Sequence, residues 1–542
     1  MRWASIVRAL MIAFGSVGVG WCDLIHVGTM ESASPQSVMD SLVAFANRST
    51  FDLNTIDAQK YVAQFLKMPT LDGADLKGPL RGYMLTDPKI LTNAFDFIFL
   101  NELPISREGT PIERALANNY GREGVVEGIT CMANPLNAMA PTALYCLVTN
   151  QRAWVSVSFD AVRWAQVSGL INSNPPPARP AGEIAVELDP LKCQKAYPQV
   201  FQSLFAPWCE TKNPQSAPKP LQAKLAISGM GVRLATTVFP CADSAWATMA
   251  QRDPAAVDAL MRYVPEHAFA SFFYGENVMA KDVLARTGLF LTDLPLLKER
   301  VVYLAPTKNN QGFVLVQIAR LTERADLPKI CMLLDGASVG SQLILKRIVA
   351  RKEGTQEIER FSFAERTGAA TQSNAGFLEQ GIEFVTPLFR QGVLEVMVKD
   401  GLLIWAVASE SSVRTEMMFL PGAAAVKTVA QRIQAQNETL QGQPVAGFEL
   451  SAVALFRHLV SILPGSKPEH VRLFPVNNYP AYGGMVVDAS GRVMIGGFVH
   501  PAEIAALLRV NRDGREVLQE LLFMMMTLQL QRPAEPQKEK AK

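Results

Sequence analysis

The chain of 542 residues is 49% hydrophobic and 19% charged, a balance typical of a folded, core-rich protein and not of a disordered one. This length is too great for one ordinary hydrophobic core and predicts two to four domains. The formal charge of +2 comes without a concentrated basic patch, which argues against a nucleic-acid partner.

Residues 1–22 have the pattern of a cleavable signal peptide. Arg2 and Arg8 supply the positive start, an apolar run too short to span a bilayer follows, and small residues precede a cut near position 22. An uncleaved N-terminal anchor is the alternative, whereas a lipoprotein signal at Cys22 is disfavoured by the bulky Trp21. We therefore expect a periplasmic or extracellular protein with no membrane span after cleavage.

Cysteine spacing predicts disulfide bonds in that oxidising destination. Removal of Cys22 leaves six cysteines, and two local bridges fit the pattern. Cys131 would pair with Cys146 across a turn-rich stretch, and Cys193 with Cys209 around one helix. Each bridge would contribute about 3 kcal/mol in a chain-entropy account. The alternative is that all six are buried thiols.

A faint internal repeat is the most informative feature of the sequence. The run at 144–150, leading to Trp154, resembles the run at 394–400, leading to Trp405, and both have the pattern of a β-hairpin. Two further pairs follow in the same order at a similar offset: 186–188 with 448–450, and 231–240 with 491–501. Three matches in one order predict two tandem copies of one unit.

The two copies are predicted at residues 23–262 and 267–530. Proline-containing stretches at 174–180 and 441–444 divide each copy into halves. The halves lie near 23–173 and 181–262 in the first copy and near 267–440 and 445–530 in the second. The charged tail at 531–542 is predicted to be disordered.

The predicted elements favour an α+β fold in which antiparallel sheets, built from hairpins, are backed by helices. Helices are expected at 37–47, 57–66, 341–351, 424–436, 501–510 and 515–530. The last of these carries a methionine cluster that we expect to be core, with an adaptable partner groove as the alternative.

Ser338 lies in a Gly-x-Ser-x-Gly sequence, the pattern of the nucleophile elbow of serine hydrolases. That elbow requires a strand, a sharp turn and a helix, which we predict at 330–334 and from 341 onwards. His500 would be the general base, and Asp400, on a hairpin turn, the acid that orients it. His458 and His470 also follow Ser338 and are alternative bases.

Several observations weigh against catalysis at Ser338. The pattern fixes three residues in a chain with 36 glycines, and no His-Gly-Gly stretch for an oxyanion hole precedes it. The neighbouring elements are predicted to be antiparallel, whereas that enzyme class has a parallel sheet. The first copy lacks the motif and has Phe239 in place of His500. A helix cap and a glycine turn explain the stretch without chemistry.

The remaining candidates for ligands are sparse. His26 and His267 each precede a short apolar run, and a structural role is expected because no second ligand stands at metal spacing beside either. No phosphate-loop or zinc pattern is present, so the sequence predicts neither a cofactor nor a metal site. The aromatic run at 269–274 is expected to be a buried strand, with the lining of a ligand site as the alternative.

These features together predict an exported, non-enzymatic protein. It would bind a protein partner or an apolar ligand through a pseudo-symmetric scaffold of two α+β copies. The alternative is a secreted serine hydrolase that uses Ser338, His500 and Asp400.

Overall fold

The structure, a computed structural model, describes residues 24–48, 59–87, 97–133, 143–197, 219–241, 254–274, 297–365, 392–408 and 440–506, with short gaps inside several of these ranges. The chain divides into two compact units. The first comprises residues 1–43, 53–210 and 214–226, and the second comprises residues 44–52, 211–213 and 227–542. The predicted signal peptide, the predicted helices at 424–436 and 515–530 and the tail lie outside the described residues.

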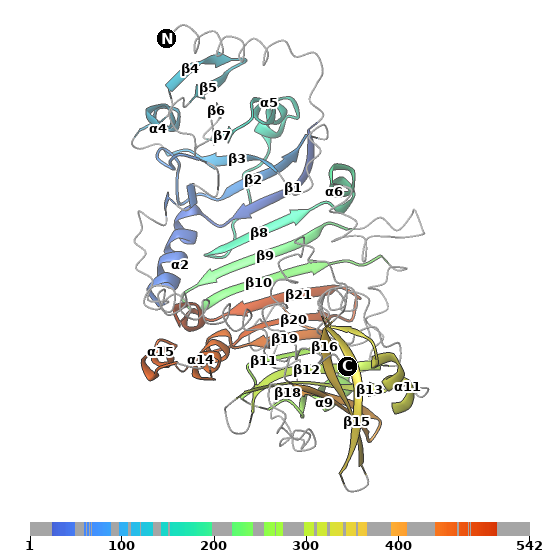
Figure 1. Cartoon of the computed structure of the whole chain (residues 1–542). Coiled ribbons are helices and arrows are strands. Elements are labelled where there is room, and N and C mark those ends of the chain that lie inside the picture. The colour runs from blue at the N-terminus through green and yellow to red at the C-terminus, as the bar shows by residue number, and fades with distance from the viewer. Residues whose placement is uncertain are drawn as a thin grey trace, which may run out of the picture. The chain divides into compact units, whose positions relative to one another are not determined.

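The first unit is built on an antiparallel sheet (Figure 1). Its strands lie in the order β9 (Leu221–Ser228), β8 (Glu183–Leu188), β1 (Ile25–Ser32), β2 (Leu80–Thr86), β3 (Ile98–Pro104), β7 (Arg152–Ser156), β6 (Ala143–Thr149), β5 (Ile129–Ala133) and β4 (Gly121–Val126). Successive side chains of a strand point to opposite faces, so each strand contributes to two layers of packing.

Helices pack on both faces of this sheet. The helix α5 (Phe159–Val167) covers the face that carries Tyr83 and Trp154. The helix α4 (Ile112–Asn119) packs on the opposite face, together with Val155. A third helix, α6 (Pro190–Ala196), follows β8 and contributes Cys193 to a smaller cluster. The helix α2 (Pro35–Arg48) follows β1, as the sequence predicted for 37–47.

The second unit is also built on an antiparallel sheet. Its strands lie in the order β10 (Gly231–Val238), β21 (Val493–Val499), β20 (Ala481–Val487), β19 (Gln443–Leu450), β11 (Ala270–Tyr274), β12 (Leu297–Pro306), β13 (Phe313–Leu321), β18 (Leu402–Ala408), β17 (Val393–Lys399), β16 (Gln356–Glu365), β15 (Leu343–Glu353) and β14 (Ser338–Val339).

This sheet too is covered on both faces. The helix α9 (Pro254–Met261) packs through Leu260 and Met261 on the face that carries Tyr303. The helix α11 (Leu327–Leu334) packs on the opposite face, against Trp405. Two further helices, α14 (Ala452–Ile462) and α15 (Pro468–Arg472), follow β19.

The coarse fold class predicted from the sequence is confirmed: the chain is a mixed fold in which antiparallel sheet dominates and helices are a minority. Both predicted hairpins are present, as β6–β7 and β17–β18. The aromatic run at 269–274 is largely strand β11, in which Phe273 is buried while Phe272 is 39% exposed.

Two elements around Ser338 were predicted wrongly. Residues 330–334 are not a strand but the end of α11, whose N-cap Asp326 accepts the Lys329 amide at 2.9 Å. Of the helix predicted at 341–351, residues 343–351 belong instead to strand β15, and 341–342 lie outside the described residues. A β-bulge between Ile348 and Arg351 shifts the alternation of this strand, so its apolar residues acquire a spacing that resembles a helix.

The predicted Cys131–Cys146 bridge is not formed in the structure. Cys131 lies opposite Tyr145. Cys146, the next residue, therefore points to the other face of the sheet. Cys193 is a free, buried thiol as well, while Cys209 lies outside the described residues. The alternative of buried thiols fits the described cysteines better.

Candidate functional site

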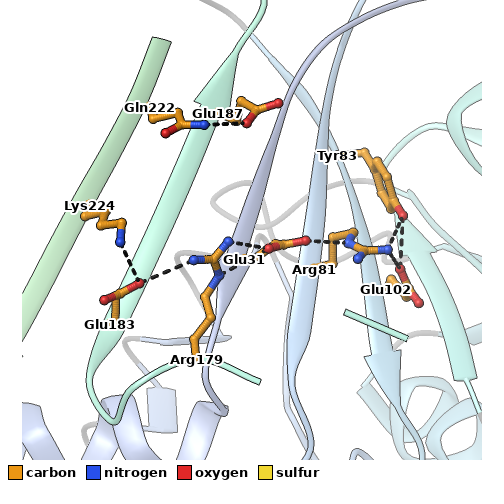
Figure 2. Close-up of polar contacts among 9 residues, drawn as sticks. All are labelled: Glu31, Arg81, Tyr83, Glu102, Arg179, Glu183, Glu187, Gln222 and Lys224. Atoms are coloured by element: carbon orange, nitrogen blue, oxygen red, sulfur yellow. Dashed lines mark hydrogen bonds and ion pairs between the residues drawn. The ribbon is translucent and has the colours of Figure 1, made fainter. Parts of the chain in front are cut away.

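A row of alternating charges crosses one face of the first unit's sheet (Figure 2). Arg81 of β2 lies opposite Glu31 of β1 on one side and Glu102 of β3 on the other. Cross-strand partners share a face of the sheet, so these side chains lie in one line. The row, which we name the charge ladder, consists of Lys224, Glu183, Arg179, Glu31, Arg81, Glu102 and Arg152.

Glu102 is the most buried member of the charge ladder, with its side chain 1% exposed. Arg152 Nη1 donates to its Oε1 at 2.5 Å, and the Tyr83 hydroxyl donates to its Oε2 at 3.1 Å. Arg81 Nη1 lies 3.6 Å from the same Oε2. A buried carboxylate is tolerated where opposite charges and hydrogen-bond donors surround it, and Glu102 has both.

Glu31 bridges two arginines. Arg81 Nε donates to Oε1 at 2.9 Å, and Arg179 Nη2 donates to Oε2 at 2.5 Å. Burial alone would raise the pKa of Glu31, but the hydrogen bonds from Arg179 and Arg81 outweigh burial and lower that pKa. The ladder continues from Arg179 to Glu183, where the two charged groups lie 3.3 Å apart.

Tyr83 belongs to both the polar and the apolar side of this face. Burial raises its pKa to about 12, so the phenol stays protonated and keeps its donor to Glu102. Its ring stacks on Trp154 with centroids 5.9 Å apart. The charge ladder is thereby joined to the aromatic packing under α5.

The outer end of the charge ladder is open to solvent. Lys224 is 53% exposed and lies 3.9 Å from Glu183. Next to it, Gln222 donates to Glu187 at 3.3 Å, and both of these residues are exposed. Acidic and basic groups alternate and are equal in number if Glu187 is included, so this surface offers hydrogen bonds and local charges without net attraction for ions of one sign.

The three residues of the predicted catalytic set lie in three separate local structures. Ser338 lies in β14 with its backbone opposite Ile344. Asp400 is exposed in the two-residue turn between β17 and β18. His500 follows β21, and its Nδ1 accepts the Ala502 amide at 3.1 Å. No hydrogen bond or ion pair connects Asp400 with His500 in the described part of the chain.

The ring of His500 stacks on Tyr479 at 4.1 Å between centroids and 11° between planes. Its pKa is lowered, first by burial and then by the charge of Arg48. Its Nδ1 caps the helical turn that begins at Pro501, a role that explains the residue without proton transfer to a nucleophile.

The alternative bases also have structural roles. His458 is buried in α14, where its Nε2 lies 2.8 Å from the carbonyl oxygen of Gly312 and its ring packs against Phe313. Burial lowers its pKa, and the hydrogen bond to Gly312 partly opposes that shift. His470 accepts the amide of Lys467 at the start of α15.

Of the two strand-start histidines, His26 is packed and His267 is exposed. The ring of His26 lies 5.6 Å from those of Tyr83 and Trp164. Burial lowers the pKa of His26, as does the charge of Lys192. The described residues contain no group of three His, Cys, Asp or Glu side chains arranged to hold a metal ion.

The charge ladder was not predicted from the sequence, although a signal existed. Glu31 and Glu102 are each the one charged acid of a strand, and Arg81 is the second residue of β2. A charged side chain inside a strand is stabilised by a cross-strand partner of opposite charge. The partners become apparent only when the pairing of distant strands is known.

No helix in the described ranges is both long and apolar enough to span a bilayer. Comparison of the chain with protein-family models, with curated proteins and with solved structures gave no match.

Proposed function

We propose that the chain is an exported, non-enzymatic binding protein made of two diverged copies of one α+β unit, and that the face with the charge ladder is its partner-binding surface. The observation that carries this proposal is a contrast between corresponding sheet faces. In the first unit this face carries the charge ladder beside the apolar part that α5 covers, whereas in the second unit the positions that correspond to the ladder are apolar and covered by α9. Of a protein partner and an apolar ligand, the polar face favours the protein.

The order of strands supports the duplication. In the first unit the order is β9, β8, β1, β2, β3, β7, β6, β5, β4, and in the second it is β20, β19, β11, β12, β13, β18, β17, β16, β15. Each strand of the first series has a counterpart at the same place and in the same chain order in the second. The helices α4 and α11 also correspond, because along the chain α4 follows β3 and α11 follows its counterpart β13.

The pairing register supports the same alignment. Glu187 of β8 and Tyr83 of β2 both lie opposite the same residue of β1. Glu449 of β19 and Tyr303 of β12 both lie opposite the same residue of β11. The Glu-Leu match found in the sequence therefore leads, by pairing alone, to a match between two buried tyrosines.

The register continues to the hairpins. Asn101 in β3 and Gln317 in β13 occupy equal positions, and both are fully buried amides. Followed through β7 and β18, the alignment matches the paired residues Thr149 and Arg152 of one hairpin with Lys399 and Leu402 of the other, as the sequence comparison did. Trp154 and Trp405 differ by one position in this register, because Trp405 corresponds to Val155.

The charged positions of the first unit correspond to apolar positions of the second. Arg81 corresponds to Val301 and Glu102 to Ile318. Both apolar residues are fully buried and pack in one cluster with Met261 of α9. The helix α9 thus covers, in the second unit, the face that carries the charge ladder in the first.

The place of α9 in the chain connects this contrast with export. Thr29 of β1 corresponds to Ser271 of β11, at an offset of 242 residues. The helix α9 directly precedes β11 in the chain. Subtraction of that offset from Pro254–Met261 gives residues 12–19, inside the predicted signal peptide. If the signal is cleaved, no equivalent of α9 remains before β1. Polar side chains suit the part of that face that α5 does not cover.

The hydrolase alternative loses its structural context. A nucleophile elbow stands between a strand and a helix. Ser338 instead follows helix α11 and precedes strand β15, in an antiparallel sheet. Fluorophosphonate labelling that is stoichiometric, and is lost in Ser338→Ala, would nevertheless overturn the non-enzymatic part of the proposal.

Export is tested by N-terminal sequencing after expression of the full chain in a secreting bacterial host. We expect the exported product to begin at Asp23. A Val17→Arg variant, which interrupts the apolar run, should remain unprocessed inside the cell. Recovery of the full-length wild-type chain from the cytoplasm would contradict the proposal.

Partner binding is tested with a photo-crosslinking amino acid at Gln222, beside the open end of the charge ladder. Lys192 on α6, which is 48% exposed, provides the control position. We expect a discrete crosslinked species from position 222 in the native host and none from position 192. Equal crosslinking at both positions, or none at 222, counts against the ladder as the binding surface.

A further inference from the structure

Two exposed phenylalanine rings lie side by side on the second unit's sheet. Phe272 of β11 is 39% exposed, Phe448 of β19 is 40% exposed, and the two residues lie opposite each other. Their rings stack with centroids 5.9 Å apart and planes at 29°. Phe273, the next residue of β11, points to the other face, where α9 packs, and is buried. The aromatic run at 269–274 thus has one ring outside the core.

Glycines continue this pair of rings across the sheet. Gly483 of β20 lies opposite Phe448, and Gly497 of β21 lies opposite Gly483. Beyond them, Leu234 of β10 lies opposite Gly497 and is 47% exposed. Cross-strand partners share a face, so these residues form one row. We name the row the apolar shelf; it consists of Phe272, Phe448, Gly483, Gly497 and Leu234. The helix α11 covers another part of the same face, around Trp405.

Gly497 is the open position of the apolar shelf. Gly483 makes room for the ring of Phe448, which a Cβ at 483 would approach to 2.1 Å. On the other face, Gly496 makes room for Leu440 in the same way, at 2.8 Å. Among the described residues, a Cβ at Gly497 would meet only backbone atoms of β20, the nearest at 3.1 Å. Glycine inside a strand often marks a place that another group approaches closely, and no described side chain takes that place at Gly497.

The apolar shelf has no charged residue beside it on its five strands. Arg233 and Glu449, which adjoin it in sequence, belong to the opposite face. Arg300 of β12 is on the same face but is only 6% exposed. A nucleic acid or a charged peptide therefore finds no complementary charge here. The flanking rows of this face consist of Tyr274, Ala446, Met485, Ile495 and Thr236 on one side and Ala270, Leu450, Ala481, Val499 and Val232 on the other.

The apolar shelf is too small to hold a second copy of the chain. Since a phenylalanine side chain has about 200 Å² of surface, the exposed parts of Phe272, Phe448 and Leu234 amount to about 250 Å². A stable dimer buries about 800 Å² on each partner. We infer that the apolar shelf binds a small, uncharged molecule with an apolar ring, which lies against the two phenylalanines and extends over Gly497.

Binding is measured with Nile red, an uncharged planar dye whose fluorescence rises in apolar surroundings, titrated into the purified full chain. We expect saturable binding. Phe272→Ser removes one ring and Gly497→Val fills the open position, so each should weaken this binding about tenfold. Phe456→Ser is the matched control, because Phe456 of α14 is also 40% exposed and also stacks on a phenylalanine. The control should leave the dissociation constant unchanged.

The two test variants act independently of each other. The φ of Gly497 is not positive, so valine suits its backbone, and circular dichroism checks that each variant is folded. If Gly497→Val does not fold, Phe272→Ser decides. Equal affinity of wild type and Phe272→Ser, absence of saturable binding to wild type, or an equal loss in Phe456→Ser overturns the inference. None of these results bears on the charge ladder, which belongs to the first unit.

Discussion

At the scale of single residues, Glu102 is the side chain on which the charge ladder depends. It is 1% exposed and contacts Arg81, Tyr83 and Arg152. We expect Glu102→Ala to reduce the free energy of unfolding by about 3–5 kcal/mol, because it leaves the partly buried Arg152 without its acid and leaves Arg81 with Glu31 alone. Denaturant unfolding of the purified protein measures this loss.

The control for Glu102 is an exposed ion pair. Arg163 and Glu127 lie 3.1 Å apart and are both about half exposed. Removal of such a pair by Arg163→Ala should change the free energy of unfolding by at most about 1 kcal/mol. Equal effects of the Glu102 and Arg163 substitutions would show that the charge ladder is no more than a set of surface pairs.

One buried and two half-buried histidines predict how stability depends on pH. The pKa values of His26, His458 and His500 are all lowered from 6.5 in the folded chain, with burial as the largest cause. Protons then bind the unfolded chain more readily. The contribution of these histidines to the free energy of unfolding is complete above pH 6.5. It is lost as the pH falls from 6.5 towards their pKa values in the folded chain. We expect a lower free energy of unfolding at pH 5 than at pH 7.5.

His458→Gln tests the assignment of this pH dependence. Glutamine can still donate to the Gly312 carbonyl oxygen but does not titrate. The difference in unfolding free energy between pH 7.5 and 5 should be smaller in the variant than in wild type. A wild-type chain that becomes more stable on acidification over this range would contradict the direction of all three shifts.

At the scale of elements, the turn between β17 and β18 depends on its backbone conformation. Asp400 and Gly401 have φ values of +51° and +76°, as a two-residue hairpin turn of type I′ requires. A Cβ at Gly401 would meet no atom within 4 Å, so Gly401→Ala tests conformation alone. We expect it to cost about 1 kcal/mol in the free energy of unfolding.

Gly124 in β4 provides the matched control for that substitution. A Cβ there would also meet no atom within 4 Å, and its φ is not positive. Gly124→Ala should therefore leave the stability unchanged or raise it slightly, because alanine loses less backbone freedom on folding. If both alanine variants unfold alike, the turn does not require its left-handed backbone.

Element boundaries show what the sequence could and could not predict. The hairpins were predictable because alternation and polar turns are local signals. The region around Ser338 was not, although Asp326-Leu-Pro328 is a helix start of a familiar kind. The serine motif favoured a strand–turn–helix at this place. The bulge in β15 gives that strand an apolar spacing that resembles a helix.

The candidate site was less predictable than the fold. Glu31, Arg81 and Glu102 lie far apart in the sequence, and each alone is an ordinary charged residue. Their significance comes from the register of β1, β2 and β3, which no local pattern determines. The predicted set of Ser338, His500 and Asp400 had motif support but no partner geometry to connect its members.

At the scale of the whole molecule, thiol labelling tests the state of the cysteines. Cys131, Cys146, Cys193, Cys241 and Cys331 are not joined by disulfides in the structure, and all but Cys131 are buried. We expect alkylation of the denatured protein without reductant to modify each of them. In the native protein labelling should be slow, since burial raises the pKa of Cys146 and of Cys193 to about 12. A mass that changes on reduction would restore the predicted bridges.

The proposed duplication was only faint in the sequence because its offset varies along the chain. The register aligns Thr29 with Ser271 at 242 residues, but Tyr83 with Tyr303 at 220 and Glu187 with Glu449 at 262. Insertions and deletions between strands account for this variation, whereas the pairing inside the sheets keeps one alignment. A comparison at one fixed offset recovers only some of the matches.

The charge ladder also limits how the two proposed copies could have diverged. Val301 and Ile318 stand in the second unit where Arg81 and Glu102 stand in the first. A single mutation from either arrangement towards the other buries a charge without its counterion, and selection would remove it. The intermediates become tolerable only while the face is solvated. If the two units are copies of one ancestor, loss or gain of the covering helix would have preceded the exchange of side chains.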